Sequence, residues 1–85
     1  MVSLEFHELQ RTHYGTKWIT VPSIGPVRYR VFSEFETGKW TALLEHHSGK
    51  VLWEVGDYLG MEDAKQEAHF HYIINIYYPS KLRQS

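Results

Sequence analysis

Two short turn signals, "ETG" at 36–38 and "HSGK" at 47–50, separate three segments in which apolar residues recur at every second position. The segments run over residues 27–35, 40–45 and 51–55, and period-2 alternation is typical of half-buried β-strands. Strands joined by such short turns must be antiparallel neighbours. The middle of the chain is therefore predicted to be an antiparallel meander.

The first 26 residues add weaker strand signals. Val2, Leu4 and Phe6 alternate with polar residues, and "KWITV" at 17–21 resumes the pattern after a break at "RTHYGT". The segment "PSIGP" at 22–26 holds two prolines and a glycine, which predicts a loop or sharp corner. One or two further strands are expected here.

After residue 57 the apolar period changes to that of a helix. Gly60 is a suitable N-cap, and Glu62 and Asp63 then lie in the first turn, where carboxylates favour the positive end of the helix dipole. Pro79 is expected to end the helix at about Tyr78. The sequence thus predicts one α+β domain over residues 1–85, with a four- or five-stranded antiparallel sheet and one C-terminal helix packed on a face.

The predicted helix has apolar residues on two sides. One stripe is expected to face the sheet, where its two alanines leave room for Trp40 and Trp53; it consists of Met61, Ala64, Ala68 and Tyr72. A second stripe lies roughly opposite and consists of Phe70, Ile73, Ile74 and Tyr77. One sheet cannot cover both stripes.

Three explanations of the second stripe remain open. The N-terminal segment (Val2, Leu4, Phe6) or the chain end around Leu82 folds over it, or it is a partner-binding surface for a second copy or another protein. Alternatively, "YIINIYY" at 72–78 is a β-strand, because β-branched and aromatic residues favour strands. Aromatic anchors of this kind are enriched at interfaces.

Composition excludes several classes of function. The chain has no cysteine, so disulfides and thiolate metal sites are excluded, and its net charge of −1 is not that of a general nucleic-acid or membrane-surface binder. Charges near the N-terminus and the lack of a long apolar span predict a soluble, cytoplasmic protein without a signal peptide. No cofactor is expected.

The six histidines do not form a convincing metal site in the sequence. His46 and His47 are adjacent in a predicted strand and should point to opposite faces, and His69 and His71 should diverge on the helix. Glu67 is four residues before His71, but no third ligand is apparent. His71 is instead expected at the boundary of sheet and helix, where its titration near pH 6 would affect stability.

No catalytic constellation or phosphate-binding loop is present, so the protein is not expected to be an enzyme. The alternative to a protein-binding function is a nucleic-acid-binding module, in which Arg28, Arg30 and Phe32 share an exposed sheet face. Glu34 and Glu45 are mixed with them, which favours a solvated face of paired charges. The two arginines could also grip an acidic protein partner.

Several landmarks follow one another along the chain: Trp18, the corner at 25–29, "GKW" at 38–40, "GDYLGMEDAK" at 56–65, and "HY" at 71–72. Their order resembles that of short uncharacterised proteins encoded by bacteriophages and prophages. The chain differs from that pattern at Met61 and at "INIYYP". The resemblance implies a small accessory protein, in the host cytoplasm, that acts stoichiometrically by occupying a site on a host protein complex, as anti-CRISPR and other anti-defence inhibitors do. A homodimer is a further expectation, because pairing two helices would bury the second stripe.

Overall fold

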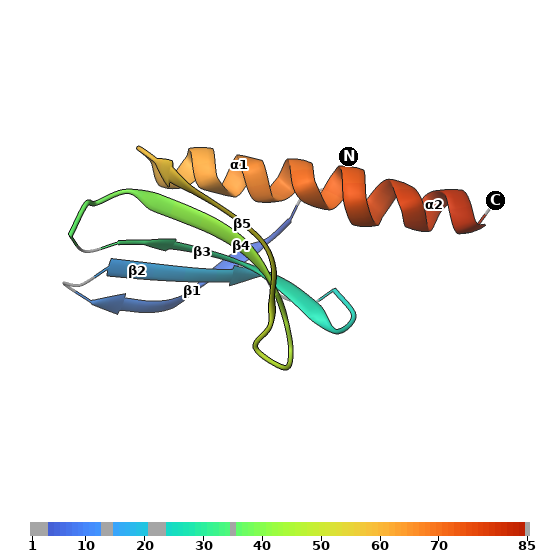
Figure 1. The fold of residues 1–85 in the computed structure, drawn as a ribbon, viewed down its shortest axis with the longest axis horizontal. Coiled ribbons are helices and arrows are strands. Elements are labelled where there is room, and N and C mark those ends of the chain that lie inside the picture. The colour runs from blue at the N-terminus through green and yellow to red at the C-terminus, as the bar shows by residue number, and fades with distance from the viewer. Residues whose placement is uncertain (1–3, 13–14, 21–23, 35, 85) are drawn as a thin grey trace.

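The computed structural model describes residues 4–12, 15–20, 24–34 and 36–84 and confirms the predicted α+β fold. Figure 1 shows a five-stranded sheet with one long helix across a face. The strands are antiparallel and lie in chain order, so the sheet is a simple meander. The elements are β1 Phe6–Thr12, β2 Gly15–Thr20, β3 Val27–Ser33, β4 Trp40–His46, β5 Val51–Tyr58, α1 Met61–Tyr72, the π-helical turn η1 Ile73–Tyr77, and α2 Tyr78–Gln84.

The first strand lies later in the chain than the alternation predicts. β1 begins at Phe6 and continues to Thr12, pairing with β2 from Phe6↔Thr20 to Thr12↔Gly15 around a bulge between Glu8 and Gln10. Of the strand expected over residues 2–7, Phe6 and His7 lie in β1, residues 4 and 5 precede it, and Val2 lies outside the described residues. β1 is an edge strand and has only one hydrogen-bonded neighbour, β2. Its hydrogen bonds to β2 keep it in the sheet although its apolar pattern is weak.

The three central strands meet the prediction closely. Tyr29 and Val31 of β3 are fully buried and lie opposite Leu44 and Ala42 of β4. The alternation predicts that these side chains point to the same face of the sheet. The predicted turns are tight: the Gly38 N–H donates to the Glu34 carbonyl over 2.7 Å, with Gly38 at φ +68°. A positive φ of this size favours glycine.

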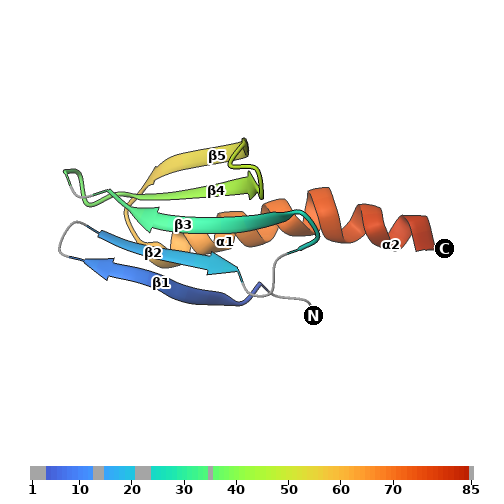
Figure 2. The same ribbon diagram turned by 90° about the horizontal axis from the view of Figure 1, so that it is seen from below.

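Helix α1 packs on the inner face of the sheet through its two alanines. Ala64 and Ala68 are fully buried against β3 and β4, and α1 also contacts β5. Figure 2 shows the helix behind the sheet, running roughly along the direction of the strands. Trp40 and Trp53 are half-buried and pack against the same core. The first predicted stripe is therefore confirmed as the sheet-facing side, and small side chains allow the close approach.

The helix continues beyond Pro79, where the sequence predicts its end. The π-helical turn η1 precedes the proline, and the Tyr78 N–H donates to the Ile73 carbonyl, five residues back. The Asn75 side-chain amide donates to the His71 carbonyl over 3.0 Å. Pro79 then lies in the first turn of α2, where its missing N–H is tolerated. The wider turn is the reason that the proline does not terminate the helix.

The last part of the helix extends past the sheet. In Figures 1 and 2, α2 projects beyond the strand ends. Among the described residues, the backbones of η1 and α2 lie close to helical residues and to no strand. The Ile76 side chain of η1 nevertheless packs against the core. The molecule is elongated for this reason, with extents of 47 × 25 × 20 Å.

Candidate functional site

A row of exposed apolar side chains runs along the outer side of the C-terminal helix. Phe70 is 47% exposed, Ile74 67%, Tyr78 57% and Leu82 76%. These four residues, here called the helix ridge, are spaced at intervals of four. Their exposed fractions and typical side-chain areas give a patch of roughly 450 Å². A contiguous apolar patch of this size lies in the range that marks functional surfaces on monomers.

The π-helical turn aligns the ridge. In a regular α-helix, residues four apart are displaced by about 40° around the axis, so an interval of four would wind around the helix. The turn Ile73–Tyr77 holds more residues than an α-helical turn, which reduces this drift where Phe70, Ile74 and Tyr78 follow one another. The same element that carries the helix past Pro79 therefore places the ridge on one side.

The structure separates the four residues of the predicted second stripe. Phe70 and Ile74 are exposed and belong to the helix ridge, whereas Ile73 and Tyr77 are half-buried beside the ridge. The Tyr77 ring lies 6.0 Å from the Tyr72 ring, measured between centroids. The strand interpretation of "YIINIYY" is wrong, because residues 72–78 are helical.

Two ridge residues, Tyr78 and Leu82, were missed in the sequence. They continue the spacing of four from Phe70, but the expected helix end at Pro79 hid that continuation. The π-helical turn that aligns them is set by backbone hydrogen bonds, and no residue pattern in this chain marks it.

The chain segments expected to cover the stripe lie elsewhere. Leu4 and Phe6 pack against the core, where they line a groove of ≈ 360 Å³ together with Lys65 and His69 of α1. Leu82 is part of the ridge itself, further along the helix. The part of the N-terminal segment that the structure describes therefore leaves the ridge open.

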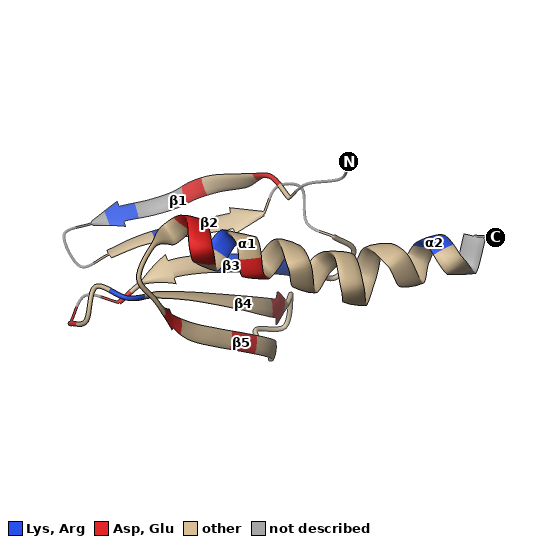
Figure 3. Cartoon of the chain, turned by 90° about the horizontal axis from the view of Figure 1, so that it is seen from above, with Lys and Arg blue, Asp and Glu red and all other residues tan. Residues whose placement is uncertain are grey.

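Charge is distributed unevenly along the helix. Figure 3 shows red and blue segments at the start of α1, a tan middle of the helix, and a blue segment in α2. In the sequence the charged residues there are Glu62, Asp63, Lys65 and Glu67, and then Lys81. From Ala68 to Ser80 the sequence has no Lys, Arg, Asp or Glu. The ridge therefore begins in an uncharged stretch between an acidic and a basic end.

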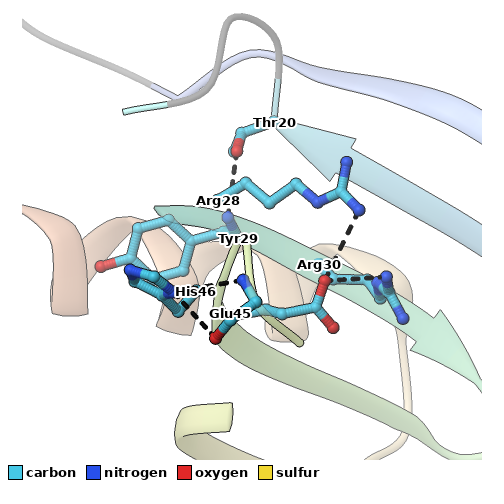
Figure 4. Close-up of polar contacts among 7 residues, drawn as sticks. Thr20, Arg28, Tyr29, Arg30, Glu45 and His46 are labelled. Carbon is cyan, nitrogen blue, oxygen red and sulfur yellow. Dashed lines mark hydrogen bonds and ion pairs between the residues drawn. The ribbon is translucent and has the colours of Figure 1, made fainter. Parts of the chain in front are cut away.

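The predicted arginine pair lies on the outer face of the sheet, away from the helix. Figure 4 shows Arg28 and Arg30 converging on the Glu45 carboxylate, with the Tyr29 ring on the other side of β3. The Arg28 and Arg30 Nη2 atoms lie 3.5 and 3.0 Å from the same Glu45 oxygen. Phe32 lies on this face too, half-buried opposite Thr41 of β4. Because one carboxylate neutralises part of the guanidinium charge, the surface has less free cation for phosphate than the sequence suggests.

The histidines do not all lie as predicted. β4 ends at His46, so the strand alternation does not extend to His47, and the two rings lie 4.1 Å apart instead of on opposite faces. The His46 Nδ1 atom lies 2.9 Å from the Ser48 hydroxyl. His69 and His71 diverge as expected, towards the groove and the sheet. No group of three or more metal-ligating side chains occurs among the described residues.

His71 connects the helix to the sheet, as the sequence predicts. Its ring stacks on Trp53 with centroids 4.1 Å apart, and its Nδ1 atom lies 2.7 Å from the Tyr29 hydroxyl oxygen. Burial raises the pKa of Tyr29 and lowers the pKa of His71. Both side chains are therefore uncharged near neutral pH, and the Tyr29 hydroxyl and Nδ1 of the neutral imidazole share one hydrogen bond.

Comparison with protein-family models, curated proteins and solved structures gives no match. Among the helices of the residues described above, none is long and apolar enough to cross a membrane.

Proposed function

We propose that this protein is a non-enzymatic protein-binding domain whose helix ridge is covered by protein in its working state. The exposed ridge is the observation that carries the proposal. Phe70 and Tyr78 are aromatic side chains of the kind that act as interface anchors, and Ile74 between them is two-thirds exposed. Covering such a patch removes apolar area from water and is the main favourable term in association.

The N-terminal part of the ridge is presented on a helix that is anchored to the sheet. Helix α1 is fixed to the sheet through Ala64 and Ala68, and η1 continues it without interruption. A surface that is already ordered loses little conformational entropy on binding. The resemblance to phage accessory proteins makes a host protein complex the expected target. The protein would inhibit that complex by occupying a site on it.

Photo-crosslinking from the ridge tests this function. A photoreactive phenylalanine analogue replaces Phe70, and a matched control carries it at Leu59, which is 85% exposed in the connection before α1. We expect irradiation of bacterial cells that express the protein to give a discrete protein adduct from position 70 and not from position 59. The proposal is wrong if position 70 forms no protein adduct, or only the adducts that the control forms.

A further inference from the structure

The two ends of the C-terminal helix carry opposite formal charge. Residues 61–67 have three acids and one lysine, a charge of −2, and residues 81–84 have two bases and no acid, a charge of +2; the residues are Glu62, Asp63, Lys65 and Glu67, then Lys81 and Arg83. The stretch between them is uncharged and carries the first three residues of the ridge. A helix of this kind is complementary to a second copy of itself that runs in the opposite direction.

We infer that the ridge is the interface of an antiparallel homodimer, in which the C-terminal helices of two copies pair about a twofold axis near Ile74. This inference rests on the proposed function and names the partner that covers the ridge. A twofold interface uses the same patch on both copies. With the axis at Ile74, residue 74 meets itself and Phe70 meets Tyr78 of the other copy, because both lie four positions from the axis.

Charge selects the antiparallel orientation. In that orientation, with residue 74 on the axis, Lys81 lies level with Glu67 of the other copy, and the exposed Asp63 lies level with the last residue of the other chain. A parallel pair would place like charges together at both ends, and like charges in adjacent helices are destabilising. The helix dipoles also oppose each other favourably when the helices are antiparallel.

The fold leaves room for this pairing. The ridge lies on the side of the helix that faces away from its own sheet, opposite Ala64 and Ala68. When two ridges meet, the helices therefore lie in the middle and the two sheets lie outside them. α2 extends past its own sheet (Figure 1). In the dimer this part of α2 covers the outer side of α1 in the other copy. Four layers result, in the order sheet, helix, helix, sheet.

The area sets the expected strength of the dimer. Full cover of two ridges removes roughly 900 Å² from water, and flanking side chains such as Tyr77 and Lys81 raise this towards about 1,200 Å². Interfaces at this lower limit of specific complexes are weak or transient. We therefore expect a dimer that dissociates in the micromolar range and loosens as salt screens the charged helix ends.

Charge replacement at the axis tests the interface. Ile74→Glu and Ile74→Lys each place two like charges at the twofold axis, so sedimentation velocity should show folded monomers where the wild type is a dimer. An equimolar mixture of the two variants should dimerise again, because Glu then faces Lys. Circular dichroism checks that both variants fold, which the 67% exposure of Ile74 supports. A wild type that stays monomeric at high micromolar concentration, or a mixture that stays monomeric, overturns the homodimer.

Cysteine crosslinking tests the orientation, because the chain has no native cysteine. Phe70→Cys mixed with Tyr78→Cys should form a mixed disulfide on oxidation in the antiparallel dimer, since disulfides need Cβ atoms about 4 Å apart. Each variant alone should form much less disulfide, and Leu59→Cys serves as the control. Disulfides that join position 70 to 70 and 78 to 78 would overturn the antiparallel arrangement.

The crosslinking experiment from Phe70 separates this inference from the proposed function. An adduct of twice the chain's mass supports the homodimer. An adduct with a different protein, together with a monomeric wild type, overturns the homodimer and leaves the protein-binding function standing. The absence of any adduct overturns both.

Discussion

Replacing Tyr29 by phenylalanine removes a single hydroxyl group from the boundary between α1 and the sheet. That hydroxyl belongs to a fully buried side chain and is hydrogen-bonded to the His71 Nδ1 atom over 2.7 Å. The ring, with its edge-to-face contact to Trp53 at 6.1 Å, is kept in the variant. Tyr29→Phe therefore isolates the hydrogen bond from the packing.

The expected loss follows from the net value of a hydrogen bond. An intramolecular hydrogen bond contributes about 0.5–1.5 kcal/mol, and His71 is only half-buried, so water can partly satisfy Nδ1 in the variant. We expect Tyr29→Phe to lower the free energy of unfolding by about 1 kcal/mol. Urea denaturation at pH 7.5 measures it, and with a slope of about 1 kcal/mol per M for a small domain the midpoint should fall by about 1 M.

A double-mutant cycle shows whether the loss belongs to this pair. His71→Phe keeps an aromatic ring against Trp53 but cannot accept the hydrogen bond. If the bond stabilises the fold, the losses of Tyr29→Phe and His71→Phe should be non-additive by about 1 kcal/mol. Losses that add within about 0.3 kcal/mol would refute the pairing of these two side chains.

The same pair makes stability depend on pH. Burial lowers the pKa of His71 in the folded protein, so the unfolded chain takes up the proton first as the pH falls. The contribution of neutral His71 is complete above pH of about 6.5 and is lost progressively below it. Within the pair Tyr29 stays neutral because burial raises its pKa, and Tyr72 is a further ionisable side chain nearby, with its ring 6.4 Å from that of Tyr29.

A non-titrating replacement gives the matched control for this pH dependence. His71→Gln can still accept from the Tyr29 hydroxyl but carries no charge at any pH. Between about pH 6.5 and pH 5, the wild type should lose more stability than His71→Gln. Parallel curves for the two proteins would contradict the lowered pKa.

Three further substitutions test the rest of the fold. Trp53→Ala should cost about 3 kcal/mol in urea denaturation, near the low end for a buried aromatic because Trp53 is half-buried; an unchanged midpoint would contradict its place beneath the helix. Gly15→Ala should destabilise by about 1–3 kcal/mol, since Gly15 has φ +146° and a Cβ there would lie 2.6 Å from the Ser33 carbonyl oxygen; a neutral result would contradict this β2–β3 geometry. Glu45→Gln should cost about 1 kcal/mol, because it leaves two guanidinium groups without their shared carboxylate; the thermal midpoint measures this, and a more stable variant would contradict it.

The sequence determines the central fold of this protein. Alternation from Val27 to Val55 gives three strands, and the short turns between them allow only antiparallel neighbours. Gly60 at the N-cap with Glu62 in the first turn gives the start of α1. Spacing also predicts that Ala64 faces the sheet. These features are local, because periodicity and turn chemistry act over a few residues.

The candidate site is only partly determined in this way. Helical spacing identifies an apolar side that the sheet cannot cover, and it includes Phe70 and Ile74, which are exposed in the structure. It also includes Ile73 and Tyr77, which lie on the flank. The end of the helix could not be predicted, because a proline normally ends a helix. The C-terminal half of the ridge, Tyr78 and Leu82, was therefore not predicted either.

Tertiary structure decides the remainder. The polar segment from His7 to Thr12 is a strand because β2 supplies its hydrogen bonds, although the segment itself has no clear alternation of apolar residues. The π-helical turn at Ile73–Tyr77 directly precedes Pro79 and aligns the ridge, and its Tyr78 N–H donates to the Ile73 carbonyl five residues back. Both outcomes depend on where backbone donors find acceptors in three dimensions, and residue periodicity does not specify that.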